Sequence, residues 1–62
     1  MKARVKAVHG SYVTMSILLN GVEVSEYHVE YKDIKITDIA VGQMFNAQKD
    51  SFGGWTFWRE GQ

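Results

Sequence analysis

An Asn-Gly pair, Asn20-Gly21, separates two runs in which apolar and polar residues alternate, Tyr12–Leu19 and Val22–Tyr31. An Asn-Gly pair in this setting is the strongest short-range signal of a β-hairpin, because a type I′ turn needs a positive φ at both central residues. An earlier run, Lys2–Val8, also alternates and is followed by a His9-Gly10-Ser11 turn. The first half of the chain therefore predicts a three-stranded antiparallel meander.

The run Lys2–Val8 has one small, apolar face and one basic face. The residues predicted to point inward are Ala3, Val5 and Ala7. The residues predicted to point outward are Lys2, Arg4 and Lys6. Small alanines on an inner face predict that a bulky side chain packs over this strand, and the two tryptophans are the candidates.

The run Val22–Tyr31 changes the parity of its apolar residues part-way along. Its apolar residues are Val22 and Val24 at even positions, then Tyr27, Val29 and Tyr31 at odd positions. A β-bulge near Ser25-Glu26 adds one residue and would return both sets to one inner face. The alternative is a bent strand whose two halves face different layers.

The segment Asp38–Lys49 allows two interpretations. As a helix it would place Val41, Met44 and Phe45 on one face. As a bend followed by a strand it would turn at Gly42. A glycine inside a helix costs about 1 kcal/mol relative to alanine, so the strand is favoured and the helix is the alternative.

The remaining segments add two short strands. Residues Ile34–Thr37 alternate and predict one of them. Residues Asp50–Gly54 predict a turn, and Trp55–Glu60 predict the last strand. In that strand Trp55 and Phe57 share the inner face, whereas Trp58 points outward with Thr56.

Together these segments predict a single all-β domain over residues 1–62, a small antiparallel barrel or strongly twisted meander of five to six short strands. The alternative fold class is α+β, with a helix at about residues 38–49. The pattern D-I-A-V-G-Q-M-F-N-A…G-G-W-T-F-W-R-E-G, from Asp38 to Gly61, resembles the central part of SH3-like barrels and is similar to the opening strands of oligonucleotide-binding (OB-like) barrels. The resemblance implies a small barrel. The acidic loop and proline-binding features of SH3 domains are missing from this sequence.

The composition restricts what can stabilise so small a chain. It has 62 residues and no cysteine, so neither disulfides nor thiolate zinc sites are available. Small domains usually need a disulfide, a metal site or a partner for stability, which favours a homodimer or a module that docks on another protein. Seven Lys and Arg residues balance seven Asp and Glu residues, so the chain lacks the basic field of a dedicated nucleic-acid binder.

Other functional classes find little support in the residues. The only histidines, His9 and His28, lie in different predicted strands, so no metal site is expected. No nucleophile-elbow or phosphate-loop pattern occurs, so no catalytic residue and no cofactor are predicted and the chain is expected not to be an enzyme. No apolar run approaches the ~20 residues of a membrane-spanning helix, and no signal-peptide pattern is present. A cytoplasmic location is expected.

The favoured function is protein binding. Exposed Trp and Arg are enriched among binding hot spots, so Trp58 and Arg59, with Tyr31, are the predicted partner-binding residues. Pairing through an open strand edge is a second mechanism. The size of the chain suggests an accessory or inhibitory factor of the phage or mobile-element type.

The alternative function is the binding of single-stranded nucleic acid. It uses the basic row Lys2, Arg4 and Lys6, with Tyr12, Tyr27 and Trp58 as stacking platforms. The competing structural interpretation is a solvated edge strand whose lysines prevent edge-to-edge aggregation.

Overall fold

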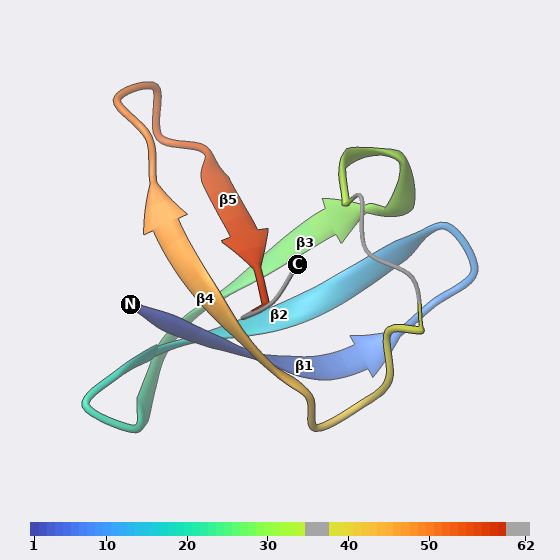
Figure 1. Cartoon of the computed structure of the whole chain (residues 1–62), viewed down its shortest axis with the longest axis horizontal. Coiled ribbons are helices and arrows are strands. Elements are labelled where there is room, and N and C mark those ends of the chain that lie inside the picture. Colours follow the sequence, from blue (N-terminus) through green and yellow to red (C-terminus); the bar gives the residue numbers. More distant parts are fainter. Residues whose placement is uncertain (35–37, 60–62) are drawn as a thin grey trace.

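The computed structural model describes residues 1–34 and 38–59, and the strands in these ranges form one antiparallel sheet (Figure 1). The strands are β1 (Lys2–Val8), β2 (Tyr12–Leu19), β3 (Val22–Glu30), β4 (Met44–Lys49) and β5 (Trp55–Trp58). A short 3-10 helix, η1 (Tyr31–Asp33), follows β3. Neither described range contains an α-helix, and neither contains a helix of the length and apolarity needed to cross a membrane.

The strand order in the sheet is β3-β2-β1-β4-β5, and the sheet curls into a half-barrel. Figure 1 shows β3 and β5, the two edge strands, facing each other across the curled sheet. The rings of Tyr27 in β3 and Phe57 in β5 are 6.2 Å apart, so the curl brings side chains of both edges together. The predicted all-β class is confirmed.

The β2–β3 hairpin forms at the predicted turn. Asn20 and Gly21 have φ angles of 53° and 81°, as a type I′ turn requires. A bulge lies close to its predicted position: the register passes from Ile17↔Ser25 to Leu18↔Glu23, which leaves Val24 as the extra residue. The expectation that this bulge would return Val22 and Val24 to the inner face is wrong, because both side chains are exposed.

The segment after Asp38 is a bend and a strand, so the helical alternative is wrong. Gly42 has a φ of 93°, a conformation that glycine adopts without steric cost. The N–H of Gly42 donates to the carbonyl of Val5 at 2.8 Å, and the N–H of Val5 donates to the carbonyl of Gln43 at 2.9 Å. These bonds start the β1–β4 ladder, and β4 begins at Met44.

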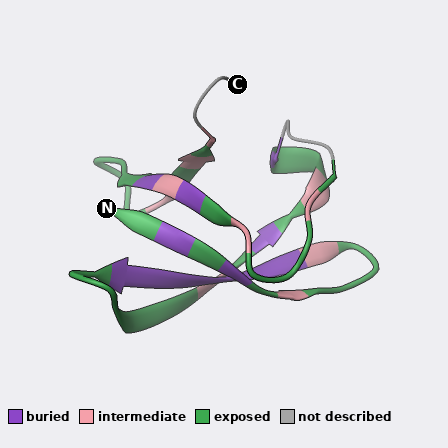
Figure 2. Ribbon diagram, turned by 60° about the horizontal axis from the view of Figure 1, so that its bottom comes forward, coloured by how far each residue is buried: buried purple, intermediate pink, exposed green. Residues whose placement is uncertain are grey.

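The concave side of the half-barrel holds the core. The buried cluster consists of Ala3, Val5, Val13, Met15, Ile17, Val29, Ile34, Phe45 and Ala47. The alternation of buried and exposed residues along β1 is visible in Figure 2. The large buried side chain beside the small residues of β1 is Phe45, which pairs with Ala3, and Trp55 packs against the same core cluster.

Three predicted boundaries differ from the structure. Strand β3 ends at Glu30, so Tyr31 belongs to η1. Strand β5 ends at Trp58, and Glu60 lies outside the described residues. Most of the strand predicted at Ile34–Thr37 also lies outside them; Ile34 itself is buried in the core.

Candidate functional site

A single row of cross-strand neighbours runs across the convex, outer face of the sheet. The cross-strand pairs that define it are Glu23 opposite Leu18, Leu18 opposite Lys2, Lys2 opposite Asn46, and Asn46 opposite Trp58. Residues directly opposite each other have Cβ atoms about 4.5–5.5 Å apart. The row therefore connects Lys2 to Trp58 through one intervening residue.

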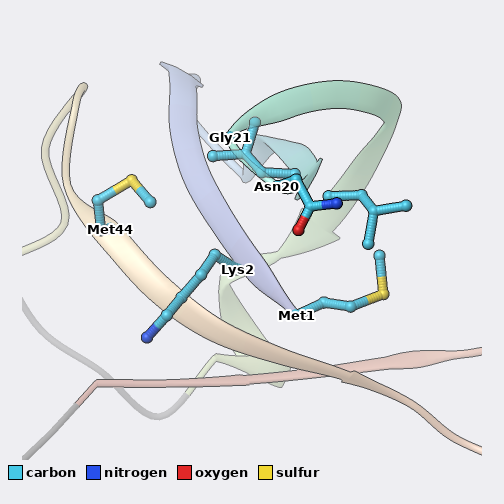
Figure 3. A pocket seen from close by; sticks show the side chains of 7 residues that line it. Met1, Lys2, Asn20, Gly21 and Met44 are labelled. Carbon is cyan, nitrogen blue, oxygen red and sulfur yellow. The ribbon is translucent and has the colours of Figure 1, made fainter.

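A hollow opens beside this row, where the tip of the β2–β3 hairpin meets the starts of β1 and β4 (Figure 3). Its volume is about 420 Å³, and its lining residues are Met1, Lys2, Leu18, Leu19, Asn20, Gly21 and Met44. Leu18 is only 5% exposed, whereas Leu19 is 52% and Met44 is 45% exposed. We call this feature the apolar hollow.

Local structure explains why apolar side chains gather there. The turn at Asn20-Gly21 reverses the chain directly after Leu18 and Leu19, so both leucines lie at the end of the hairpin. The bend at Gly42 brings Met44 to the start of β4, where it pairs with Arg4 on the outer face. Three segments far apart in the sequence thus supply one apolar surface.

The three cations of β1 lie on the outer face as predicted, but they differ in their partners. Lys6 forms ion pairs with Glu23, at 3.5 Å, and with Glu26. The hydrogen bond to Glu26, together with the charges of both glutamates, raises the pKa of Lys6. A hydrogen bond from the Ser16 hydroxyl, and then the charge of Lys6, lowers the pKa of Glu23.

Lys2 and Arg4 are not neutralised in this way. The Nζ of Lys2 donates to the side-chain oxygen of Asn46 at 2.6 Å, a neutral acceptor. Within residues 1–34 and 38–59, no carboxylate forms an ion pair with Lys2 or Arg4. The outer face is therefore positive beside the apolar hollow and neutralised at Lys6.

These features define one surface, which we call the docking face. It consists of Met1, Leu19 and Met44, which line the apolar hollow, and of Lys2, Arg4 and Trp58 on the outer face beside it. Trp58 is 38% exposed and lies at the end of the cross-strand row. The docking face combines four exposed apolar side chains with two cations that no described carboxylate neutralises.

The structure does not bring the three predicted partner-binding residues together. Trp58 points outward, as expected from its parity. The guanidinium of Arg59 lies 5.6 Å from the centre of the Phe45 ring, so it covers the core instead of extending the outer face. Tyr31 is half-buried and packs against the core cluster.

The predicted nucleic-acid residues are also divided. Strand β1 is central in the sheet, so the interpretation of its cations as guards of an edge strand is wrong. Tyr12 lies on the outer face, but its ring stacks on that of His9, with ring centres 4.2 Å apart, and contacts the tilted ring of His28, with ring centres 5.3 Å apart. Tyr27 lies on the inner face, where it packs against the core and Phe57.

A second hollow accompanies this stack of rings, at the end of the β1–β2 hairpin. Its lining residues are Ser11, Tyr12, His28 and Glu30. The Nε2 of His9 is 3.3 Å from the hydroxyl of Thr14. The histidines therefore pack against Tyr12, and no group of three or more metal-binding side chains occurs in the part of the chain that the structure describes.

Sequence reasoning missed Met1, Leu19 and Met44 as surface residues. Two signals were present. Leu18-Leu19 interrupts the alternation of its strand directly before the turn, so one of the two leucines has to leave the core. Met44 is out of phase with Phe45 and Ala47, which places it on the opposite face of the same strand.

Comparisons with known proteins give no family for this chain. No protein-family model matches it. No curated protein and no solved structure shows significant similarity to it. Its function is therefore inferred from the docking face.

Proposed function

We propose that this chain is a non-enzymatic protein-binding module that contacts its partner through the docking face. The supporting observation is that Met1, Leu19, Met44 and Trp58 leave apolar surface exposed around the unneutralised cations Lys2 and Arg4. Contiguous exposed apolar surface on a small protein marks an interaction site, whereas scattered apolar residues do not.

The side-chain types on the docking face suit protein recognition. Methionine is flexible and polarisable, and it is used at surfaces that adapt to a partner. Tryptophan is the residue type most enriched among interface hot spots. Binding through such a face would let the module act as an accessory or inhibitory factor by occupying part of its partner's surface.

The partner is expected to be a different protein whose surface offers apolar side chains to the hollow and negative charge to Lys2 and Arg4. A second copy of this chain fits less well. A two-fold contact centred on the docking face would bring the same two cations of each copy together, and like charges at an interface are unfavourable.

The proposal is tested by affinity capture with matched variants. Trp58→Ala and Met44→Asp should each lose a partner protein that the wild-type chain retains from an extract of its source cells. Phe52→Ala is the control, because Phe52 is 95% exposed in the β4–β5 loop and lies outside the docking face. Circular dichroism would verify that all three variants keep the fold.

Two results would count against protein binding by this face. One is a captured protein that survives Trp58→Ala and Met44→Asp but is lost with Phe52→Ala. The other is self-association: if analytical ultracentrifugation shows a dimer that Met44→Asp dissociates, the face is covered by a second copy.

Single-stranded nucleic acid is the second candidate, because Lys2 and Trp58 lie in one cross-strand row. An aromatic ring beside a cation is the arrangement that binds single strands, at about 1–3 kcal/mol for each stacked base. Addition of an oligothymidylate should then quench tryptophan fluorescence, and the quenching should weaken steeply with salt. Unchanged fluorescence at low salt would exclude this candidate.

A further inference from the structure

Building on the proposed function, we propose that the docking face recognises a short acidic segment of the partner in extended form. In this segment a large apolar side chain occupies the apolar hollow, and an Asp or Glu one or two residues away binds Arg4 or Lys2. The inference narrows the partner surface of the proposed function to one short extended segment with a defined spacing between its apolar and acidic residues.

The hollow selects an uncharged, apolar side chain. The side chains of Met1, Leu18, Leu19 and Met44 supply its apolar lining, and the ammonium group of Lys2 is bonded to Asn46 of β4. Figure 3 shows the Lys2 side chain directed away from the hairpin turn at Asn20-Gly21. A charged group inserted between the methionines and leucines would lose its hydration without gaining a partner.

The adjacent cations select a carboxylate. A guanidinium presents a planar fork of N–H donors that matches the two oxygens of a carboxylate, and Arg4 has no ion-pair partner among the described residues. The ammonium of Lys2 has three N–H donors, and the structure shows one bond, to Asn46. Lys6, on the same strand, differs from Lys2 and Arg4, because its ammonium group already forms ion pairs with Glu23 and Glu26.

The spacing within the partner segment follows from the sheet. Arg4 and Met44 are directly opposite each other, so their Cα atoms are about 4.5–5.5 Å apart. An extended chain advances about 3.3 Å per residue. A segment that places one side chain between Met44 and Leu19 therefore reaches Arg4 within one or two residues.

The same face disfavours a polyphosphate chain. Glu23 and Glu26 also lie on the outer face. They belong to the edge strand β3, whereas Trp58 belongs to β5 at the other edge of the sheet. A continuous nucleic-acid strand that followed Lys2, Arg4 and Lys6 would meet these two carboxylates. Of the aromatic side chains proposed for base stacking, Tyr12 already packs between the rings of His9 and His28, and Tyr27 faces the core. A compact acidic segment avoids both problems.

Selection from a random peptide library displayed on phage tests the inference. Four forms of the full chain serve as bait: wild type, Lys2→Gln/Arg4→Gln, Leu19→Asp/Met44→Asp, and the control Lys32→Gln/Lys49→Gln. The control removes the same net charge from exposed lysines outside the docking face. Wild type and control should enrich peptides in which Asp or Glu lies one or two residues from a large apolar residue.

The variants should separate the two parts of the recognition. Lys2→Gln/Arg4→Gln should keep the apolar preference and lose the acidic one, and Leu19→Asp/Met44→Asp should enrich neither. For the best peptide, replacing its carboxylate by the corresponding amide should weaken binding to wild type about two- to fivefold, as expected for one exposed ion pair. The same replacement should leave binding to Lys2→Gln/Arg4→Gln unchanged.

Different failures overturn different statements. If wild type enriches apolar peptides without any acidic preference, the acidic-segment inference is wrong and the protein-binding proposal stands. If wild type enriches nothing beyond what Leu19→Asp/Met44→Asp enriches, the docking face does not bind extended peptides and the inference is also wrong. Trp58-dependent capture of a folded protein would then still support the proposed function.

Discussion

Glu23 shows how a single residue organises the outer face. Its carboxylate accepts a hydrogen bond from the Ser16 hydroxyl and pairs with the ammonium of Lys6. Ser16 is buried although it is polar, so Glu23 supplies a partner that the Ser16 side chain needs. The same ion pair keeps the charge of Lys6 from adding to that of Lys2 and Arg4.

The lowered pKa of Glu23 predicts a dependence of stability on pH. A carboxyl group whose pKa is lower in the folded state stabilises the fold above its unfolded pKa, about 4.5, and loses this effect as the pH falls through the folded pKa. Wild type should melt at a higher temperature than Glu23→Gln at pH 7, and the difference should shrink as the pH falls well below 4.5.

Thermal unfolding followed by circular dichroism at several pH values measures this difference. The control is Glu30→Gln, which removes the same charge from the same strand, where the salt bridge to Lys32 is largely exposed. A melting-temperature difference for Glu23→Gln that stays constant from pH 7 to strongly acidic pH would contradict the assigned cause.

The sequence predicted the outward position of Trp58, and the same alternation places Arg59 on the opposite, inner side with Trp55 and Phe57. The structure agrees with this parity, because the guanidinium of Arg59 lies over the Phe45 ring. Grouping Arg59 with Trp58 in one outward patch therefore overlooked the alternation. The ring that Arg59 covers belongs to β4, and no local pattern around residue 59 identifies it.

At the level of elements, turns were easier to predict than bulges. The β2–β3 turn could be predicted because its two central residues need a positive φ, and an Asn-Gly pair adopts this conformation readily. The bulge in β3 was expected from a change of parity, but its exact position at Val24 depends on pairing with β2. A second irregularity, at Lys6 in β1, shifts the register so that Val5 pairs with Met15 but Ala7 pairs with Thr14, which belongs to the outer face. The prediction that Ala7 shares the inner face with Ala3 and Val5 is therefore wrong, and the unbroken alternation of the sequence does not reveal the shift.

The edges of the sheet differ in their protection. Strand β3 carries a bulge and three glutamates, features that discourage pairing with another chain. Strand β5, with the sequence W-T-F-W, has no charge, and its register against β4 is continuous. If the module also pairs through a strand edge, β5 is the edge available for it.

Two glycine substitutions test the turn chemistry of the β2–β3 hairpin. A Cβ atom placed on Gly21 or on Gly10 would have no neighbouring atom within 4 Å. Of these two glycines only Gly21 has a positive φ, 81°. Gly21→Ala should therefore destabilise the fold by about 1–2 kcal/mol, the cost of a left-handed conformation. Gly10→Ala should change stability by only a few tenths of that amount. Urea unfolding measures both, and equal losses would contradict the explanation from φ.

For the whole molecule, the fold class could be predicted and the strand order could not. Alternation and turn residues are local, so five strands and an antiparallel meander follow from short stretches of sequence. The pairing of β1 with β4 joins Lys2 to Asn46, and neither residue's surroundings specify the other. The docking face depends on that pairing, which is why its methionines were not recognised as one surface.

The small core predicts a high sensitivity to truncation. Stability of about 0.05–0.15 kcal/mol per residue gives this 62-residue chain a total of about 3–9 kcal/mol. Replacing a buried Phe by Ala costs about 3–5 kcal/mol, and Phe45 is 1% exposed and also stacks under Arg59.

Phe45→Ala should therefore be largely or wholly unfolded at 25 °C. A loss of chemical-shift dispersion among the amide protons in its NMR spectrum would show this. Phe52→Ala, a change of the same type at an exposed site, should unfold in urea at the wild-type midpoint. A folded Phe45→Ala protein that loses less than about 1 kcal/mol would show that Phe45 is not central to the core.

The central position of β1 also protects the molecule against mispairing. A shift of this strand by one residue would exchange its two faces. Lys2, Arg4 and Lys6 would then enter the concave side, and Ala3 and Val5 would face water. Because β1 pairs with a strand on each side, the shift would disrupt the pairing of β1 with β2 and with β4 at the same time. The cations that we assign to partner binding thus also fix the alignment of the sheet.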